Sequence, residues 1–512
     1  MKKEDLLHAM NDIDSSYVQD AQKADRKTGR RKFLPAGIAA ACLCLVVGAG
    51  LLVYGTGRAD RQDREPAAPT LPLSKDPQKN PGGDLQADSA YADYAIVQAS
   101  YPECAPYPDA EKFGDASQGA DDYKTMWANW SKQRERIGQS EAYRDGLYPY
   151  YGATMKEFLV SDEKVNRTYS PLNLYMALSM LAEMTKGNSR AQILELLGVP
   201  DIAAVRERAS ALWIANYSDD GMVSSILANS LWLRQGDEFN PGTMQTLADT
   251  YHASSFCGEM GSEEFTQAFR ARMNAQTGGL LQEQVEGLSL EPEMVLALVS
   301  TIYYRAQWQD IFLEENTRED IFHKADGDIT CDFMHQEKYG VCYQGENFSA
   351  IRLSLEHSGD MWLFLPDETA DVNDVAAGDD LLKLLRSGGD WENRVSATIN
   401  LAMPKFDVVS EINLIDGLKA MGVTDVFDEY AADFGSLKED EDGLYVSEAK
   451  HAARVSVDEK GCTAAAYTMM AINESGYFEP PEEIDFVLDR PFLFALTGAD
   501  GTLLFTGVVE EP

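Results

Sequence analysis

The chain is long, acidic and of ordinary globular composition. Its 512 residues allow one large domain with appendages, or several small domains. Apolar residues make up 44% and charged residues 25%, which are the proportions of a globular protein. The formal net charge of −40 excludes nucleic acid, heparin and anionic lipid as good partners for the bulk of the chain.

An uncharged apolar run lies near the N-terminus, between Phe33 and Tyr54. As a helix it is about 33 Å long, enough to cross a bilayer core of about 30 Å. The basic residues just before it are Arg26, Lys27, Arg30, Arg31 and Lys32. The arginines after it are interleaved with acidic residues. The positive-inside rule therefore places residues 1–32 in the cytoplasm and the rest outside, as a single-pass protein of the cell membrane.

A cleaved signal peptide is the alternative to an uncleaved anchor. Gly55-Thr56-Gly57 is an acceptable small-x-small cleavage site. However, the apolar run and the region before it are both long for a signal peptide. We therefore predict one transmembrane helix over residues 33–54.

The remainder divides into a spacer and a globular region. Residues 55–110 are rich in Pro, Gly and Asp and lack apolar periodicity, which predicts a flexible extracellular linker. Trp127 and Trp130 stand at helical spacing and predict a helical lead-in. The domain is thus expected to comprise residues 111–512, with its core beginning at about residue 150.

Helical patterns come first in this domain and strand patterns come later. Apolar residues recur at helical spacing from Leu174 to Leu181 and from Ala191 to Leu197. The later segments that alternate as strands are Val395 to Met403, Arg454 to Asp458, Phe492 to Leu496 and Leu503 to Val509. Helices early and strands late favour an α+β fold over an alternating α/β fold.

The sequence contains none of the common catalytic or nucleotide-binding motifs that we sought. It has no GxSxG, HExxH or P-loop motif, and no GxGxxG followed by a suitably spaced acidic residue. None of its six histidines stands beside a Cys, Asp or Glu at metal-ligand spacing, and His451 is interpreted as a buried core residue. We therefore expect no enzyme, no metal and no other cofactor.

The seven cysteines do not form a disulfide scaffold in a chain of this length. The five outside the apolar run are Cys104, Cys257, Cys331, Cys342 and Cys462. A disulfide between Cys331 and Cys342 would close a hairpin, a pairing that the sequence leaves open.

Separate segments of the region from residue 150 to the C-terminus resemble the serpin family in order and spacing. The matching segments are Asn166–Leu172, Ala228–Trp232, Leu298–Trp308, Met403–Phe406, Val457–Gly461 and Phe486–Phe494. The resemblance implies a serpin fold, with three β-sheets, about eight or nine helices and an exposed reactive-centre loop, here preceded by one transmembrane helix. It suggests a bacterial, membrane-anchored member of that family.

The resemblance also implies a hydrogen-bonded cluster beneath the main sheet, the shutter, and a neighbouring region called the breach. The residues it assigns to them are Ser170, Pro171, Asn173, Ser300, Trp308 and His451. Asn173 stands where a serine is usual, and Ser300 where an asparagine is usual. The hydrogen-bond network of the shutter is therefore expected to differ from that of the family.

The segment around Gly461 resembles the hinge of an inhibitory reactive-centre loop. In that mechanism a protease cleaves the loop, whose N-terminal part then inserts into the main sheet as a new central strand. Gly461 bends freely because it has no Cβ. Strand alternation would place the small residue Ala464 on one face and the bulky Tyr467 on the other. The hinge residues are Glu459, Lys460, Gly461, Cys462, Thr463, Ala464, Ala465, Ala466, Tyr467 and Thr468.

The bait position follows from counting along the loop. Counted as in the inhibitory members of the family, the fifteenth residue from Gly461, with Gly461 included, is Ser475, so the resemblance implies a scissile bond between Ser475 and Gly476. Because the segment up to Pro491 is longer than usual, the alternative bait residues are Glu474, Tyr477 and Phe478. Serine suits the shallow pocket of elastase-like or subtilisin-like proteases, whereas an aromatic bait suits chymotrypsin-like ones.

The resemblance thus implies a monomeric suicide-substrate inhibitor of serine, and by extension cysteine, endopeptidases, displayed at the cell surface. Two alternatives remain: a non-inhibitory serpin-fold binding or carrier module, and an adhesion protein that uses the fold as a scaffold. The run of small residues after Gly461 favours the inhibitor, because a loop that does not insert has no need of small side chains.

Overall fold

The structure, a computed structural model, covers most of the chain after residue 90. The residues it describes are 44–47, 90–109, 119–278, 281–439, 444–461 and 482–512. All of them belong to one unit, Ala40–Pro512. The predicted loop residues from Cys462 to Phe478 lie outside the described residues, as do residues 1–32 and most of the predicted membrane run.

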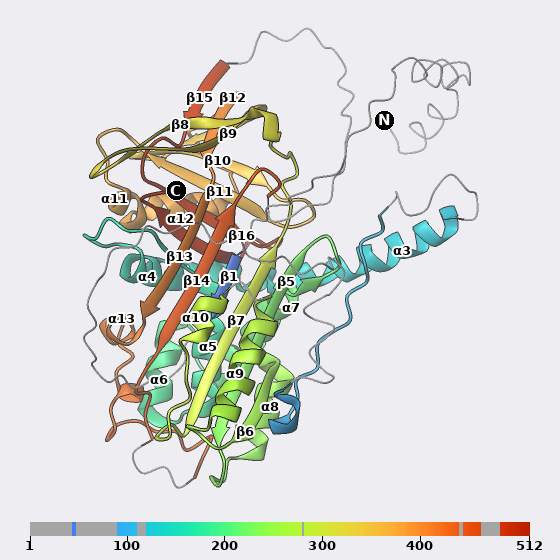
Figure 1. The fold of residues 1–512 in the computed structure, drawn as a ribbon, viewed down its shortest axis with the longest axis vertical. Coiled ribbons are helices and arrows are strands. Elements are labelled where there is room, and N and C mark those ends of the chain that lie inside the picture. The colour runs from blue at the N-terminus through green and yellow to red at the C-terminus, as the bar shows by residue number, and fades with distance from the viewer. Residues whose placement is uncertain (1–43, 48–89, 110–118, 279–280, 440–443, 462–481) are drawn as a thin grey trace. The chain divides into compact units, whose positions relative to one another are not determined.

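Helices dominate the first half of the described chain (Figure 1). They are η1 (Ala92–Tyr94), α3 (Gly119–Gln133), η3 (Arg134–Leu147), α4 (Tyr148–Phe158), α5 (Pro171–Met184), α6 (Gly187–Leu196), α7 (Ile202–Asn216), α8 (Pro241–Tyr251), α9 (Glu263–Gln276), α10 (Gln282–Glu286), η4 (Glu314–Asn316), α11 (Val372–Ala377), α12 (Asp379–Ser387), α13 (Ile415–Ala420) and η5 (Asp425–Phe427). The described residues contain eleven α-helices, more than the eight or nine expected, because the lead-in helix α3 and short helices such as α10 add to the set.

Helix α5 is the buried helix at the centre of the domain. It begins at Pro171, whose fixed φ suits the first helical position, and the Ser170 hydroxyl caps it by accepting from the Asn173 N–H. Every residue of α5 is buried, so its apolar character is needed on all sides. The helical pattern predicted from Leu174 to Leu181 is confirmed.

The first sheet has the strand order β13-β14-β1-β7-β5-β6-β2, with β4 attached to β5. Its strands are β1 (Cys44–Val47), β2 (Ala95–Val97), β4 (Ser218–Asp219), β5 (Ser224–Arg234), β6 (Ala253–Gly258), β7 (Leu296–Arg305), β13 (Phe406–Asn413) and β14 (Lys450–Val457). Figure 1 shows β14 and β7 running along the long axis, with β1 between them.

The second sheet has the order β15-β12-β9-β10-β11-β16-β17-β3, with β8 attached to β9. Its strands are β3 (Arg167–Tyr169), β8 (Thr317–Lys324), β9 (Gly327–Gln344), β10 (Phe348–Ser354), β11 (Asp360–Pro366), β12 (Arg394–Pro404), β15 (Glu482–Val487), β16 (Phe492–Thr497) and β17 (Leu503–Val509). The four strands predicted from alternation correspond to β12, β14, β16 and β17 and are confirmed.

The long strand β9 corrects one expectation and answers one open question. The described residues form two hydrogen-bonded sheets rather than three, because β9 runs for 18 residues and joins what would otherwise be separate sheets. Cys331 and Cys342 both lie on β9, so their Cα atoms are about 36 Å apart at about 3.3 Å per residue. This separation excludes a disulfide between them, the pairing that the sequence left open, and both thiols are free.

Only a small part of the predicted membrane run is described. Cys44–Val47, within the run from Phe33 to Tyr54, form strand β1 of the first sheet. No helix among the described residues is both long and apolar enough to cross a bilayer. The remainder of the run lies outside the described residues, so the span over 33–54 stays a prediction.

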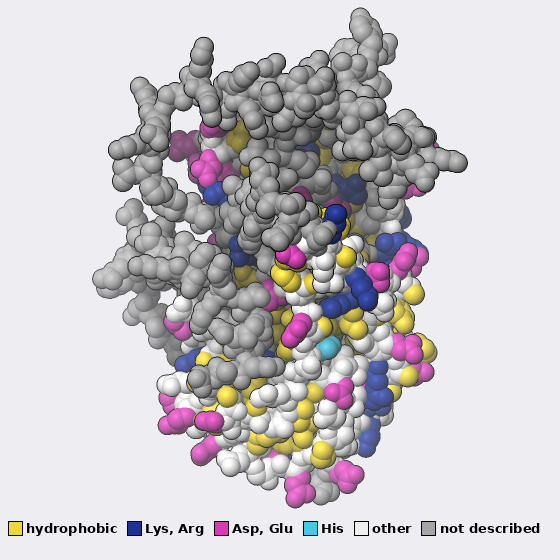
Figure 2. Space-filling model, turned by 90° about the vertical axis from the view of Figure 1, so that its right-hand side faces the viewer, with side chains coloured by type: hydrophobic (Ala, Val, Ile, Leu, Met, Phe, Trp, Pro, Cys, Tyr) yellow, Lys and Arg dark blue, Asp and Glu magenta, His cyan; other side chains and the backbone are white. Residues whose placement is uncertain are grey.

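Charge is mixed on the face drawn in Figure 2. Acidic and basic side chains are interspersed over its described part, with apolar side chains between them. The large acidic excess of the chain is therefore not gathered into a single field on this face.

Candidate functional site

A gap one strand wide separates β7 from β14 in the first sheet. Within the described residues β7 pairs on its outer side with β5, and β14 with β13, but β7 and β14 do not pair with each other. Strand β1 fills part of the gap: Cys44 lies opposite Tyr304 and Val455, and Val47 lies opposite Thr301 and Ala452. The gap thus accepts a strand that is antiparallel to both of its neighbours.

Gly461 lies at the upper end of this gap, in the turn that follows β14. It pairs antiparallel with Gln307 on one side and Asp458 on the other. Its φ of 93° lies in the left-handed region that disfavours side chains, and a Cβ at this position would collide with the backbone of Trp308. Glycine is therefore required for this turn, which is the last described part of the chain before the predicted loop.

Trp308 and Glu459 support the turn from the two sides of the gap. The Trp308 backbone N–H donates to the Lys460 carbonyl over 3.2 Å, and its indole N–H donates to the Asp458 carbonyl over 2.9 Å. The buried Glu459 carboxylate accepts from the Thr317 hydroxyl over 2.8 Å.

The ionisation of Glu459 is set by these same contacts. Burial by itself would raise the pKa of Glu459, but hydrogen bonds from its own backbone N–H and from Thr317, together with the Lys405 charge, hold it below the usual value. The carboxylate therefore remains an acceptor for Thr317 at neutral pH.

The predicted shutter residues meet beneath the gap. The Ser170 N–H donates to His451 Nε2 over 3.0 Å, and Asn173 Nδ2 donates to the Ser300 carbonyl over 2.9 Å. The Ser300 hydroxyl donates to Asn173 Oδ1. The two departures from the family pattern thus compensate each other, because Asn173 and Ser300 bind each other directly.

His451 is neutral in this network. The side chain is fully buried, and burial lowers its pKa to about 3. A neutral imidazole leaves Nε2 free to accept from the Ser170 N–H. Pro171 begins α5, next to the cluster, and Trp308 lies outside it, at the upper end of the gap.

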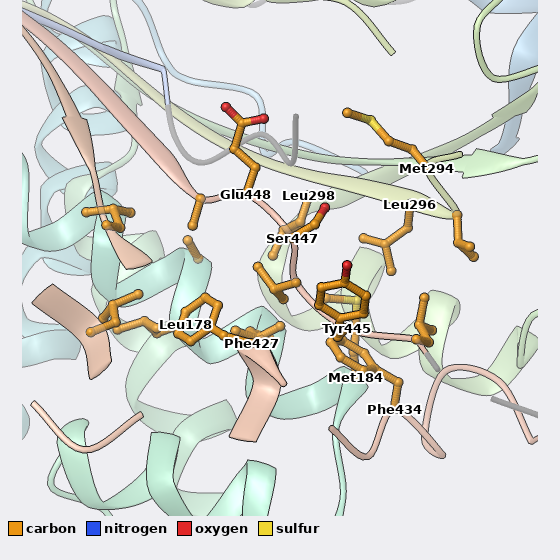
Figure 3. Close-up of a pocket in the computed structure, with 18 of the residues that line it drawn as sticks. Leu178, Met184, Met294, Leu296, Leu298, Phe427, Phe434, Tyr445, Ser447 and Glu448 are labelled. Carbon is orange, nitrogen blue, oxygen red and sulfur yellow. The ribbon is translucent and has the colours of Figure 1, made fainter. Parts of the chain in front are cut away.

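A cavity of about 180 Å³ lies at the lower end of the gap, between β7 and α5 (Figure 3). Its walls are largely apolar and include Leu178, Leu296, Leu298, Phe427 and Phe434.

Glu448 lies at the edge of this cavity, and Figure 3 shows its carboxylate turned away from the aromatic rings. Lys450 donates to its Oε1 over 2.7 Å, and burial raises the pKa of Glu448. Its Oε2 is buried without a hydrogen-bond partner in the described part of the chain.

Only three of the predicted hinge residues, and none of the predicted bait residues, belong to the described part of the chain. Glu459, Lys460 and Gly461 lie at the upper end of the gap, whereas the hinge residues from Cys462 to Thr468 lie outside the described residues. The bait residues from Glu474 to Phe478 also lie outside them.

Sequence reasoning missed one cluster, which joins the lead-in to the domain. In the structure the lead-in extends further than predicted from the sequence and comprises the described residues 90–109 and 119–147. Tyr107 and Trp130 of the lead-in contact His357, in the turn between β10 and β11. Trp127 and Trp130 at helical spacing were the only signal, because the partners are far apart in sequence.

Metal-ligating side chains do not gather in this site. In the described ranges, no group of three or more His, Cys, Asp or Glu residues is placed to hold a metal ion.

Comparison with known proteins agrees with this geometry. A family model described as serpin (serine protease inhibitor) matches residues 153–512. Serpin-ZX of Arabidopsis thaliana is 27% identical over 365 residues, covering 68% of this chain and 92% of that protein. Plasminogen activator inhibitor 1 of Neovison vison is 28% identical over 380 residues, covering 70% of this chain and 90% of that protein.

Solved structures share the fold. The thermophilic serpin tengpin in its native state superposes with a TM-score of 0.61 at 23% identity, covering 81% of this chain and 100% of that chain. Thyroxine-binding globulin in complex with thyroxine superposes with a TM-score of 0.60 at 21% identity, covering 72% of this chain and 98% of that chain. With the family model spanning most of the chain, this protein belongs to the serpin family, a family of protease inhibitors rather than catalytic enzymes.

Proposed function

We propose that this protein is an inhibitory serpin, which traps an endopeptidase by inserting its cleaved loop into the gap between β7 and β14. One observation carries the proposal: Gly461, the last described residue before the loop, already pairs with Gln307 and Asp458 at the upper end of that gap. A loop that leaves from this position reaches the gap without crossing any other part of the sheet.

The pairing of Gly461 sets the register of an inserted loop. If the pairings of Gly461 with Gln307 and with Asp458 continue down the gap, Ala464 lies opposite Tyr304 on β7 and Val455 on β14. Strand β1 supports this register, because Cys44 lies opposite the same two residues. The pairing with β7 and the pairing with β14 thus predict the same position for Ala464 in the gap. The loop and β1 would occupy the same positions, so β1 has to leave the gap before the loop inserts.

The register also decides which side chains would face the core. On β14, Val455 is buried between the partly exposed Arg454 and Ser456, so a residue opposite Val455, such as Ala464, would face inward. Continuing downward, Met470 would lie opposite Leu298 and Ile472 opposite Leu296, two residues that line the cavity. An inserted loop would therefore gain ladder hydrogen bonds on both edges and fill apolar space with its own methionine and isoleucine.

The bait remains Ser475–Gly476 in this proposal, with Glu474, Tyr477 and Phe478 as the alternatives. Elastase-like or subtilisin-like serine proteases are the first class of target, and chymotrypsin-like proteases the second. The experiment is incubation with porcine elastase and, separately, chymotrypsin, followed by a denaturing gel. Inhibition predicts a covalent complex that resists SDS, and mass spectrometry of the released C-terminal fragment identifies the bond. Complete cleavage without any complex would refute the inhibitory function for those proteases.

A carrier of small apolar molecules is the second candidate. The apolar cavity favours it, and the solved structure of thyroxine-binding globulin is a complex with thyroxine. A carrier would keep its ligand in the cavity while its loop acts only as a substrate. Binding of an apolar fluorescent dye, with and without prior loop cleavage, separates the two functions, since an inserted loop would displace the dye.

We propose further that the inhibitor, as a bacterial surface protein, is displayed outside the cell by a span over residues 33–54. The basic residues before the run and the mixed charges after it support this topology. Because Cys44–Val47 lie in the gap as β1 in this structure, one molecule cannot hold them in a membrane and in the sheet together. Protease added to intact cells should release the domain, and protection of the domain would refute the topology.

A further inference from the structure

An aromatic cluster joins the lead-in to the domain at a place that the proposed function does not use. The ring centroids of Tyr107, Trp130 and His357 lie 4.9 to 5.3 Å from one another. The Trp130 side chain is buried, and its indole N–H donates to Asp220 Oδ2 over 2.8 Å. A buried and hydrogen-bonded tryptophan fixes this part of the lead-in in one position.

Arg134 extends this contact to the tight turn between β10 and β11. Its Nη1 donates to the His357 carbonyl over 2.6 Å, and its guanidinium lies 5.0 Å from the centre of the Trp130 ring. His357 has a φ of 53°, in the left-handed region that is uncommon for residues other than glycine. The lead-in thus binds the turn at His357, the residue of the turn whose backbone conformation is least favourable.

The same turn holds the segment that follows β7 beside the hinge. The Glu356 N–H donates to the Gln307 carbonyl over 2.7 Å, and Leu355 pairs with Trp308. Gln307 pairs in turn with Gly461. Residues 307 and 308 therefore lie between the turn and the hinge and are bound to both.

We propose that Trp130 and Arg134 are positioning residues for the hinge. They fix the turn at 355–359, the turn fixes Gln307 and Trp308, and these two residues hold Gly461 at the entrance of the gap. Strand addition to an open sheet edge is favourable, so the entrance has to remain closed until the loop is cleaved. The lead-in serves this purpose from outside the family's own region, which begins at residue 153.

The primary test is amide hydrogen exchange of the full chain, which does not depend on inhibition. Arg134→Met keeps the aliphatic stem and removes the donor to His357. Exchange of segments 305–309 and 458–461 should become about tenfold faster, because a hydrogen bond from a charged donor is large enough to change a local opening equilibrium by that factor. Arg134→Lys keeps a charged donor and should restore most of the protection.

Asp145→Asn is the matched control. Asp145 binds Arg386 over 3.1 Å and tethers the same lead-in to helix α12, away from the hinge. This variant should leave exchange at 305–309 and 458–461 unchanged. Equal exchange in Arg134→Met and the parent, or equal acceleration in Asp145→Asn, would overturn the positioning role.

A second measurement tests whether a loosened hinge shortens the lifetime of the inhibitory form. This effect rests on the proposed function. During storage at 37 °C, Arg134→Met should lose its ability to form covalent complex about tenfold faster than the parent, without cleavage of the chain. If the parent forms no complex at all, the inhibitory function fails while the exchange result still decides the positioning role. If both proteins lose activity at the same rate, the hinge is not controlled by Arg134.

Discussion

Gly461 lies so close to Trp308 that a Cβ on the glycine would overlap the tryptophan's backbone nitrogen. This contact exists because Gly461 adopts a left-handed φ of 93° at the entrance of the gap, where it pairs with Gln307. In an inserted strand the same residue would be extended, a conformation that any residue adopts. The contact therefore distinguishes the uncleaved form from the inserted form.

The first prediction follows from that difference. Gly461→Ala should lower the thermal midpoint of the uncleaved protein, since a left-handed conformation costs roughly 1–2 kcal/mol for a residue with a Cβ, and the collision adds to this. The cleaved form should be unaffected. Gly388→Ala is the control, because Gly388 has a φ of 61° and open space around it. Equal losses in the uncleaved and cleaved forms would show that Gly461 does not change conformation.

Cleavage of the loop should make the protein more stable. Limited proteolysis between residues 473 and 479 frees the loop to enter the gap, where it gains hydrogen bonds along β7 and β14 and fills the cavity. Several kcal/mol of added stability correspond to a rise of roughly 10 °C in the thermal midpoint. Differential scanning calorimetry before and after cleavage measures it. A midpoint that stays the same or falls would favour the carrier function.

The two faces of the inserting loop should tolerate charge differently. Ala464→Arg would bury an unpaired charge opposite Tyr304 and Val455, at a cost of several kcal/mol, so that insertion becomes too slow to trap the protease. The variant should be cleaved as a substrate, with little covalent complex on a gel. Tyr467→Arg changes the outward face and should cost much less. If Tyr467→Arg were as damaging as Ala464→Arg, the face assignment would be wrong.

Acid should destabilise the folded protein through His451. Burial lowers its pKa to about 3, whereas in the unfolded chain it is about 6.5. The unfolded chain therefore binds a proton between these two values that the folded protein does not bind. Stability is fully present above pH 6.5 and falls by about 1.4 kcal/mol per pH unit as the pH decreases toward 3.

Urea unfolding at pH 7, 6, 5 and 4 measures this dependence. The contribution of His451 is isolated by His451→Gln, which keeps an acceptor for the Ser170 N–H but does not titrate. The loss of stability with decreasing pH should be shallower in that variant than in the parent. Identical slopes would assign the acid sensitivity to other groups.

The shutter should depend on the direct contact between Asn173 and Ser300. Ser300→Ala removes the donor to Asn173 Oδ1 and leaves that oxygen buried, at a cost of about 1–3 kcal/mol. Thermal unfolding of the uncleaved form measures the loss. Thr301→Ala is the comparison. Thr301 is the next residue on β7, and this variant removes the hydroxyl that donates to the Ala228 carbonyl within the sheet. Full stability of Ser300→Ala would mean that the contact adds nothing.

The sequence by itself determined the elements whose signals are local. Helix α5 follows from the Ser170 cap, Pro171 and a continuous apolar stretch, and β12, β14, β16 and β17 follow from alternation. The order of motifs identified the family resemblance, and with it the hinge at Gly461. The helix and the strands depend on residues within a few positions of one another, so propensity and periodicity suffice to find them. The family resemblance rests instead on the order and spacing of motifs along the chain.

Only the tertiary structure decided the features that depend on distant pairs. It showed that β9 is one continuous strand, which joins two sheets and separates Cys331 from Cys342. It brought Ser300 to Asn173, so that two apparent departures became one contact. It also placed Arg134 and Trp130 against the turn at His357, more than 200 residues away in sequence. Contacts of this kind arise from the packing of whole elements, which no local pattern in the chain records.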